Sequence, residues 1–363
     1  MFLRKLLKRG LSGMVIPCPV DTRFHQKAVR VAILGANTYT GEMLAYLLKQ
    51  NPIVSQIYLF GDSSVFGISA DLRHFDTRSR VKAYCGREGL SKSLRRADIV
   101  VLVGSDKCST NADHETRLRS ELDNVVMYAD ACTKYAPKSL IAVCVRPVST
   151  TMPIVSDIFR NTHWYHPGRI IGSSALTQAR INSYIGLFQD LDPRCVHVPI
   201  IGGPDTDNVV PLLSRALPAT ILPCDIPKVH LKIKDWKKNT ATKCEPSGDL
   251  KDCRLSEAYS INQLVTTMAL GLCGDDYAIT TAFIRQNIIP TCRYLVSTVQ
   301  FGPSGVIHNF GIPRLTQYEL KTFEDATNQL KTLEEMALKV LNLTNAVQKL
   351  TSFETVHSPS VEE

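Results

Sequence analysis

The sequence lacks several features that would assign it to a special class of protein. No apolar run approaches the roughly 18 residues that a membrane-spanning helix needs, so no helical membrane anchor is predicted. It has 11 cysteines but no Cys-x-x-Cys pair and no His/Cys cluster at zinc-ligand spacing. Cysteines such as Cys144 and Cys195 lie in apolar stretches, which predicts buried thiols in a reducing compartment. Low-complexity tracts and internal repeats are also missing, and 363 residues suffice for two ordinary domains.

Acidic residues are missing from positions 1–20, which hold four of the cations behind the net charge of +8. Apolar side chains there fall near one helical face and basic ones largely on the other, which predicts a basic amphipathic helix, as in a mitochondrial transit peptide. A surface helix or a disordered leader is the alternative. The remaining charge is scattered among acids, so no nucleic-acid-binding surface is predicted. We therefore expect a leader over residues 1–22 and a location in the mitochondrial matrix.

Apolar runs and helical periodicity alternate in the first half of the chain. Runs at 29–34, 57–60, 99–103 and 140–145 predict strands, and apolar residues recur at helical spacing after Gly41. This alternation predicts an N-terminal Rossmann-type, doubly wound parallel sheet.

The second half has a looser pattern that predicts an α+β substrate domain. Strand-like runs at 196–201, 294–299 and 305–310 precede an amphipathic helix with apolar residues at 330–341, and residues 228–250 predict an exposed polar excursion. The expected organisation is a leader (1–22), a nucleotide-type domain (28–172), a C-terminal substrate-type domain (173–347) and a flexible tail (348–363).

Six segments give a more specific indication. They are NPIVSQIYLF, ADLRHFDTR, LIAVCVRPVSTTMPIVSDIF, LFQDLDPRCVHVPIIGG, LSEAYS and FGIPRLTQYE. In this order and spacing, from about residue 29 to 341, the chain resembles the mitochondrial-type malate dehydrogenases of the lactate/malate dehydrogenase family. The resemblance implies NAD as the cofactor, interconversion of malate and oxaloacetate, and a symmetric dimer.

The resemblance also assigns cofactor positions to this chain. The glycine turn keeps Gly35 and Gly41, but Thr38 and Tyr39 stand between them, where their side chains would crowd a pyrophosphate. Gly61 stands where the family has the aspartate that accepts hydrogen bonds from the ribose. Glu121 replaces an asparagine that meets the cofactor, and Glu257 replaces a methionine that lines the nicotinamide site.

The substrate positions have changed as well. Cys108 and His114 occupy the places of two arginines that clamp the carboxylates of the substrate, and neither provides a planar two-pronged donor. Arg146 replaces an asparagine that orients the substrate. Arg180 alone matches the family, as the arginine that holds the distal carboxylate; the alternative is a surface or interface arginine.

The proton-transfer pair is absent. Malate oxidation needs a base, and the family uses a histidine held by an aspartate. Pro204 and Thr177 occupy those two positions. The sequence therefore predicts a catalytically silent relative that acts as a binding or assembly partner, pairing with itself or with an active relative, or binding a small dicarboxylate or other anion. The alternative is a divergent active NAD(P)-dependent 2-hydroxy acid oxidoreductase with residual malate dehydrogenase activity.

Overall fold

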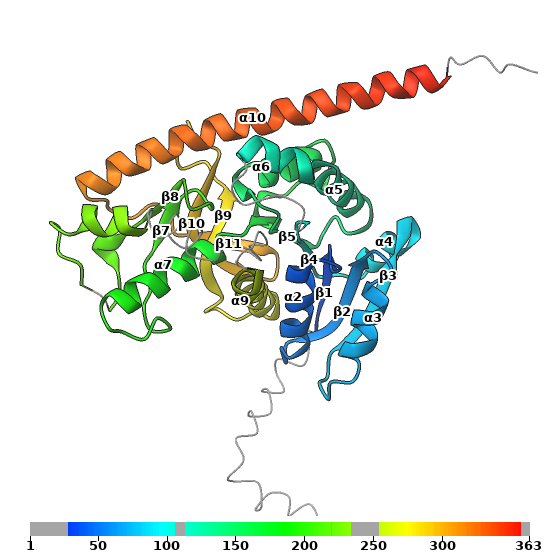
Figure 1. The fold of residues 1–363 in the computed structure, drawn as a ribbon, viewed down its shortest axis with the longest axis horizontal. Helices are drawn as coiled ribbons and strands as arrows, with labels where there is room; N and C mark the ends of the chain where they lie inside the picture. Colours follow the sequence, from blue (N-terminus) through cyan, green and yellow to red (C-terminus); the bar gives the residue numbers. More distant parts are fainter. Residues whose placement is uncertain (1–27, 106–112, 219, 234–253, 357–363) are drawn as a thin grey trace, which may run out of the picture.

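The computed structural model describes residues 28–105, 113–218, 220–233 and 254–356, and for 344–356 it describes the backbone alone. Figure 1 shows a central sheet flanked by helices, with the long helix α10 lying across one side. Within these residues the sheet has 11 strands in the order β3-β2-β1-β4-β5-β6-β9-β10-β7-β8, and β11 pairs with β10. The predicted α/β class is confirmed. None of the described helices is both long and apolar enough to cross a membrane.

The strands of the first half are parallel. β1 (Val29–Leu34) lies between β2 (Val54–Gly61) and β4 (Ile99–Leu102). β3 (Arg80–Cys85) extends the sheet beyond β2, and β5 (Leu140–Val143) and β6 (Ile170–Gly172) extend it beyond β4. The order of the strands therefore reverses beside β1, which is the doubly wound arrangement predicted from the sequence.

The strands of the second half continue the same sheet in antiparallel fashion. β6 pairs with β9 (Ile279–Arg285), which pairs with β10 (Tyr294–Gly302). Beyond β10 follow β7 (Ile200–Gly202) and β8 (Val209–Pro211), and β11 (Gly305–Asn309) forms a hairpin with β10.

Alternating side chains of the central strand enter two different cores. Ala32 and Leu34 belong to the core that is covered by α4 (Gly86–Leu94), α5 (His114–Tyr135) and α6 (Val148–Arg160). Val31 and Ile33 belong to the core covered by α2 (Tyr39–Lys49), α3 (Val65–Leu72) and α9 (Arg254–Cys273). Because α9 packs on α2, a helix from the second half of the chain completes the packing of the first half.

The long helix α10 (Gln317–Val356) has a well-defined start. Glu319 accepts from the N–H and the hydroxyl of Thr316, and the Thr316 hydroxyl accepts from the N–H of Glu319, which is a capping box. Ser214, in the short 3-10 helix η3 (Leu213–Arg215), donates to the same carboxylate. The expected apolar stripe is confirmed, since Leu330, Val340 and other residues of α10 are buried.

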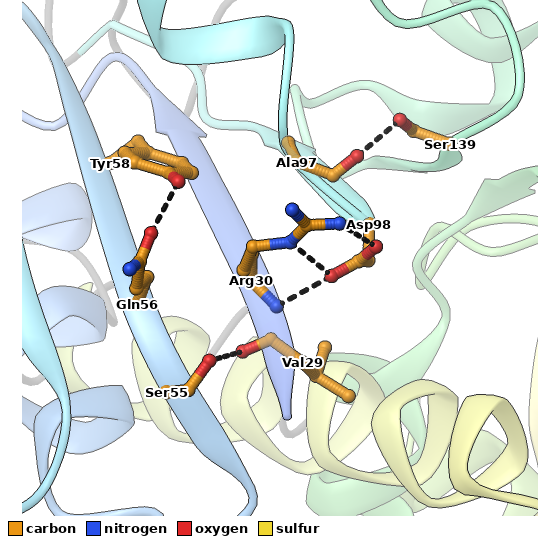
Figure 2. A network of polar contacts seen from close by, with 8 residues as sticks. All are labelled: Val29, Arg30, Ser55, Gln56, Tyr58, Ala97, Asp98 and Ser139. Atoms are coloured by element: carbon orange, nitrogen blue, oxygen red, sulfur yellow. Dashed lines mark hydrogen bonds and ion pairs between the residues drawn. The ribbon is translucent and has the colours of Figure 1, made fainter. Parts of the chain in front are cut away.

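A polar network closes the amino edge of the parallel strands (Figure 2). The Arg30 guanidinium donates to both carboxylate oxygens of Asp98 at 2.9 and 2.8 Å, and the backbone N–H of Arg30 donates to the same carboxylate. The Ser139 hydroxyl donates to the Ala97 carbonyl at 2.6 Å. These contacts join the starts of β1, β4 and β5 side by side.

Several sequence expectations need correction. Of the expected strand 196–201, only Ile200 and Ile201 lie in a strand, β7, and His197 pairs with Leu217 in an isolated bridge. Cys144 is buried as expected, but Cys195 is exposed because it lies in the turn before that bridge. α10 continues to Val356, inside the segment expected to be a tail. The expected leader, most of the polar excursion and Cys108 lie outside the described residues.

Candidate functional site

The candidate site lies at the carboxyl ends of the parallel strands. In doubly wound sheets, ligands bind at this edge, in the crevice beside the strands where the order reverses. Here that point lies between β1 and β4, and the segments that follow β1, β2, β4 and β5 all reach it. The residues predicted to contact cofactor and substrate are on these segments, on α5 and α7, on the β7–β8 loop and on α9.

The glycine turn after β1 is kept for reasons internal to the fold. Gly35 has φ +88°, and a Cβ there would lie 2.6 Å from the Val103 carbonyl oxygen. A Cβ on Gly41 would lie 2.4 Å from the Gly35 oxygen. The Thr38 hydroxyl donates to the Gly35 carbonyl at 2.9 Å and accepts from the Gly41 N–H at 3.1 Å, so Thr38 is the N-cap of α2.

The end of β2 contains a substitute polar arrangement. A Cβ on Gly61 would lie 2.5 Å from Asn37 Oδ1, so the Asn37 side chain occupies the space beside this glycine. Asn37 Nδ2 donates to the Asp62 carboxylate at 3.1 Å, and the Ser64 N–H donates to it at 2.9 Å. The Ser64 hydroxyl and N–H, followed by Asn37, lower the pKa of Asp62.

Glu121 places a buried carboxylate directly beside the end of β4. The N–H of Ser105 donates to its two oxygens at 2.9 and 3.0 Å, and the Ser105 hydroxyl also donates to it. Burial, with a contribution from Glu121, raises the pKa of Tyr128 to about 12. The Glu121 carboxylate thus joins α5 to the segment that follows β4 through its hydrogen bonds with Ser105.

Arg146 and Glu257 form an ion pair at the end of β5. The distance from Arg146 Nη2 to Glu257 Oε2 is 2.9 Å, and the side chains are 34% and 10% exposed. Arg146 follows β5, whereas Glu257 lies in the first turn of α9. The helix dipole stabilises a negative charge at that end of a helix. The two substitutions predicted separately from the sequence are thus partners.

Thr177 and Pro204, at the two proton-transfer positions, are joined by a hydrogen bond that involves no titratable group. The Thr177 hydroxyl of α7 (Ala175–Phe188) donates to the Pro204 carbonyl oxygen at 2.7 Å, and Thr177 is buried. The neighbouring Asp205 carboxylate accepts from the N–H groups of Val148 and Ser149 at 3.3 and 3.1 Å. The structure thus brings the two predicted positions together, and neither Thr177 nor Pro204 has a titratable side chain.

His114 and Arg180 complete the predicted set. His114 begins α5, and its Nε2 lies 3.7 Å from Asp207 Oδ2. Arg180 lies half-buried on α7, one turn after Thr177, and makes no hydrogen bond or ion pair with the described residues. Arg146 and Arg180 therefore differ, since only the first has its charge offset by a carboxylate.

Comparison with known proteins identifies relatives that share this sequence pattern and fold. Residues 29–172 match the family model for the lactate/malate dehydrogenase, NAD binding domain. The mitochondrial malate dehydrogenase of Felis catus is 29% identical over 307 residues, which are 84% of this chain and 90% of that protein. The Homo sapiens counterpart is 28% identical over the same shares. Residues 29–172 thus match the NAD binding domain of the lactate/malate dehydrogenase family, and the chain as a whole is similar to mitochondrial malate dehydrogenases.

Solved structures show the shared fold of this dehydrogenase family. Malate dehydrogenase from Picrophilus torridus has a TM-score of 0.72 at 16% identity, covering 87% of this chain and 99% of that chain. A lactate dehydrogenase from a deep-sea metagenome has a TM-score of 0.70 at 17% identity, covering 86% and 99%. Both halves of the chain therefore follow the dehydrogenase architecture.

The dehydrogenase cofactor fits this site only in part. The turns after β1 and β2 keep the glycines and an accessible carboxylate, Asp62. At the position that the resemblance assigns to the nicotinamide wall, however, the Glu257 carboxylate stands in place of an apolar side chain, and it is paired with Arg146 of the substrate positions. Placing a nicotinamide ring against this charged pair would require removal of water from both charges. The residues present do not fit the nicotinamide half. No group of His, Cys, Asp and Glu suited to a metal ion occurs among the described residues.

Sequence reasoning missed the β7–β8 loop as a structural unit. Asn208 is buried, its side-chain oxygen accepts from the Asp205 N–H at 3.1 Å, and its carbonyl accepts from the Gly203 N–H at 2.7 Å. Asp205 supplies the cap that the N-cap residue of α6, Pro147, cannot provide. That missing cap was a usable signal, because a helix that begins directly after proline needs a partner for its first N–H groups.

The contact between His114 and Asp207 predicts a pH-dependent stability. Interaction with Asp207 is the main reason that the pKa of His114 is raised; Asp205 adds to it, whereas burial and Arg117 oppose it. Because the folded pKa lies above the unfolded value of about 6.5, the stabilisation is complete below that value and is lost as pH rises through the folded pKa. We expect Asp207→Asn to lower the free energy of unfolding by about 0.5–1 kcal/mol at pH 6 and to have no such effect at pH 9. Urea unfolding at both pH values measures this, and an equal loss at the two would contradict it.

Proposed function

We propose that this chain is a catalytically silent member of the lactate/malate dehydrogenase family that works in the mitochondrial matrix as a binding or assembly partner. The observation that supports silence most directly is the bond between Thr177 and Pro204. In the family reaction a base must take the hydroxyl proton as hydride leaves, and neither residue can do so. Loss of general acid–base help alone costs about 10²–10⁴ in rate.

The surrounding charges also support silence. Glu121, Asp205 and Glu257 add carboxylates at the edge where the family would bind an anionic dinucleotide and a dicarboxylate. Like charges repel these ligands and make their desolvation more costly. The matrix location rests on the acid-free N-terminus and on the names of the relatives, which are mitochondrial malate dehydrogenases.

Pairing with a second copy or with an active relative is the assembly role we propose. Large aromatic side chains remain exposed on helices of the α2, α3 and α9 group, namely Tyr46, Phe66 and Tyr259. Exposed aromatic residues favour protein–protein contact. Sedimentation of the purified chain, alone and mixed with an active mitochondrial malate dehydrogenase, tests this role. A monomer that fails to join the active enzyme contradicts it.

The second candidate is an active oxidoreductase for another 2-hydroxy acid. Arg180 favours it, because its guanidinium is available to a carboxylate, and so do the retained Gly35 and Gly41. The deciding measurement is oxidation of NADH and of NADPH by the purified chain with oxaloacetate and other 2-oxo acids, alongside cofactor fluorescence for binding. We expect no turnover above the blank. Turnover with any of these acids would replace the first proposal by the second.

A further inference from the structure

The N-terminus of α6 holds an anion that belongs to the chain itself. The Asp205 carboxylate places Oδ1 3.3 Å from the N–H of Val148 and Oδ2 3.1 Å from the N–H of Ser149. These are the first two N–H groups of a 13-residue helix whose N-cap, Pro147, makes no side-chain cap bond. Free N–H groups and the helix dipole at such a position attract negative charge. Asp205 therefore occupies the place where an external anion would bind.

A second polar group at this position is not used. The Ser149 side chain is 1% exposed, and its hydroxyl has no hydrogen-bond partner among the described residues. A buried hydroxyl without a partner destabilises the fold, because its lost hydrogen bonds to water are not replaced. The Ser149 hydroxyl is thus a third hydrogen-bond donor at the start of α6, besides the two N–H groups that bind Asp205. Three donors suit an anion that is larger than the carboxylate of one aspartate.

The residue before Pro147 provides a second anion position. Arg146 is bound by Glu257 at 2.9 Å, and that carboxylate arrives from α9, whereas Asp205 arrives from the β7–β8 loop. Two carboxylates from separate elements thus meet one short segment, residues 146–149. Glu257 offsets the charge of Arg146, and Asp205 accepts from the first N–H groups of α6.

We propose that the carboxyl end of β5 is a dianion site which the chain fills with its own Asp205 and Glu257 carboxylates. The pair of side chains mimics a small dicarboxylate and excludes it from the cleft. This inference deepens the proposed function and rests on it in one respect, since it supplies the reason why a dehydrogenase cleft does not take up substrate. Removal of the internal carboxylates opens the site to an external dianion without restoring chemistry.

The test compares Asp205→Ala with Asp207→Ala, using malonate as the probe. Asp207 lies in the same loop, its side chain is 58% exposed, and it does not bind α6, so its variant controls for the loss of one negative charge. Thermal unfolding of each full-length variant is followed in about 10 mM malonate and in sodium chloride of equal ionic strength. With a Kd of about 1 mM, malonate shifts the folding equilibrium of Asp205→Ala about tenfold. Wild type and Asp207→Ala shift no more in malonate than in chloride. The double variant Asp205→Ala/Glu257→Ala shifts further than the single one.

Either of two results overturns the inference: a folded Asp205→Ala variant that responds to malonate no more than wild type does, or a wild type that is itself stabilised by malonate. If Asp205→Ala does not fold, Glu257→Gln is measured in the same way, because it keeps the shape of the side chain and removes one of the two charges. Malonate binding by these variants is independent of turnover by the wild type. Failure of this inference is therefore distinguishable from failure of the proposed silence.

Discussion

The double variant Pro204→His/Thr177→Asp is expected to oxidise NADH with oxaloacetate no faster than the unaltered chain. The two changes restore a histidine base and its carboxylate partner at positions that lie within one hydrogen bond of each other. General acid–base help of this kind is worth about 10²–10⁴ only when the substrate is in place. The Arg146–Glu257 pair and the Asp205 carboxylate keep a dicarboxylate out, so the new base has nothing to act on.

Two controls make this result informative. Circular dichroism of the double variant shows whether it is folded, because the Thr177 position is buried and an aspartate there must be accommodated. A four-position variant that adds Arg146→Asn and Glu257→Met returns the pair to the residue types the family uses. A rise of tenfold or more in the two-position variant would show that the missing base, and not the filled cleft, is what limits the chain.

Gly35→Ala is expected to destabilise the fold by about 3 kcal/mol or more, whether or not a cofactor binds. The left-handed conformation alone costs a non-glycine residue about 1–2 kcal/mol, and Gly35 has φ +88°. The new Cβ would also lie 2.6 Å from the Val103 carbonyl oxygen, and neither backbone can yield without separating β1 from β4.

Gly86→Ala is the matched control for this change. Gly86 has φ +72°, but a Cβ there meets nothing within 4 Å, so its variant pays the conformational cost without the clash. We expect a loss of about 1–2 kcal/mol for Gly86→Ala, measured by urea unfolding beside Gly35→Ala. Equal losses would mean that the close approach to Val103 is relieved, and the retained glycine would then need a ligand to explain it.

The sequence predicted the parts of the fold that have strong apolar runs. β1, β4 and β5 are buried on both faces and read as continuous hydrophobic stretches, so they were found. β3 was missed because it is an edge strand in which Arg80 and Lys82 are exposed. β9, with seven residues, was not predicted either, and β6 and β8 were missed because each has only three residues. Such short strands are defined by their neighbours in the sheet, which no local pattern reveals.

In the candidate site as well, the sequence indicated single residues but not the contacts between distant segments. Comparison with the family pattern identified Arg146 and Glu257 one at a time, as an unsuitable cation and an unsuitable acid. Their pairing depends on α9 reaching the end of β5, which only the assembled fold determines. In the same way, no local pattern in the sequence marks Asp205 as the cap of α6, because the two segments are far apart along the chain. Pairings across elements were therefore the part that the sequence could not provide.

The network at the amino edge of the sheet has a consequence for how this chain tolerates change. Arg30, Asp98 and Ser139 fix the alignment of β1, β4 and β5 from the end opposite the cleft (Figure 2). This part of the strand alignment does not use the side chains that stand at the other edge. The contacts that align the starts of the strands and the side chains of the candidate site thus lie at opposite ends of the sheet. Site side chains can therefore change while these contacts remain.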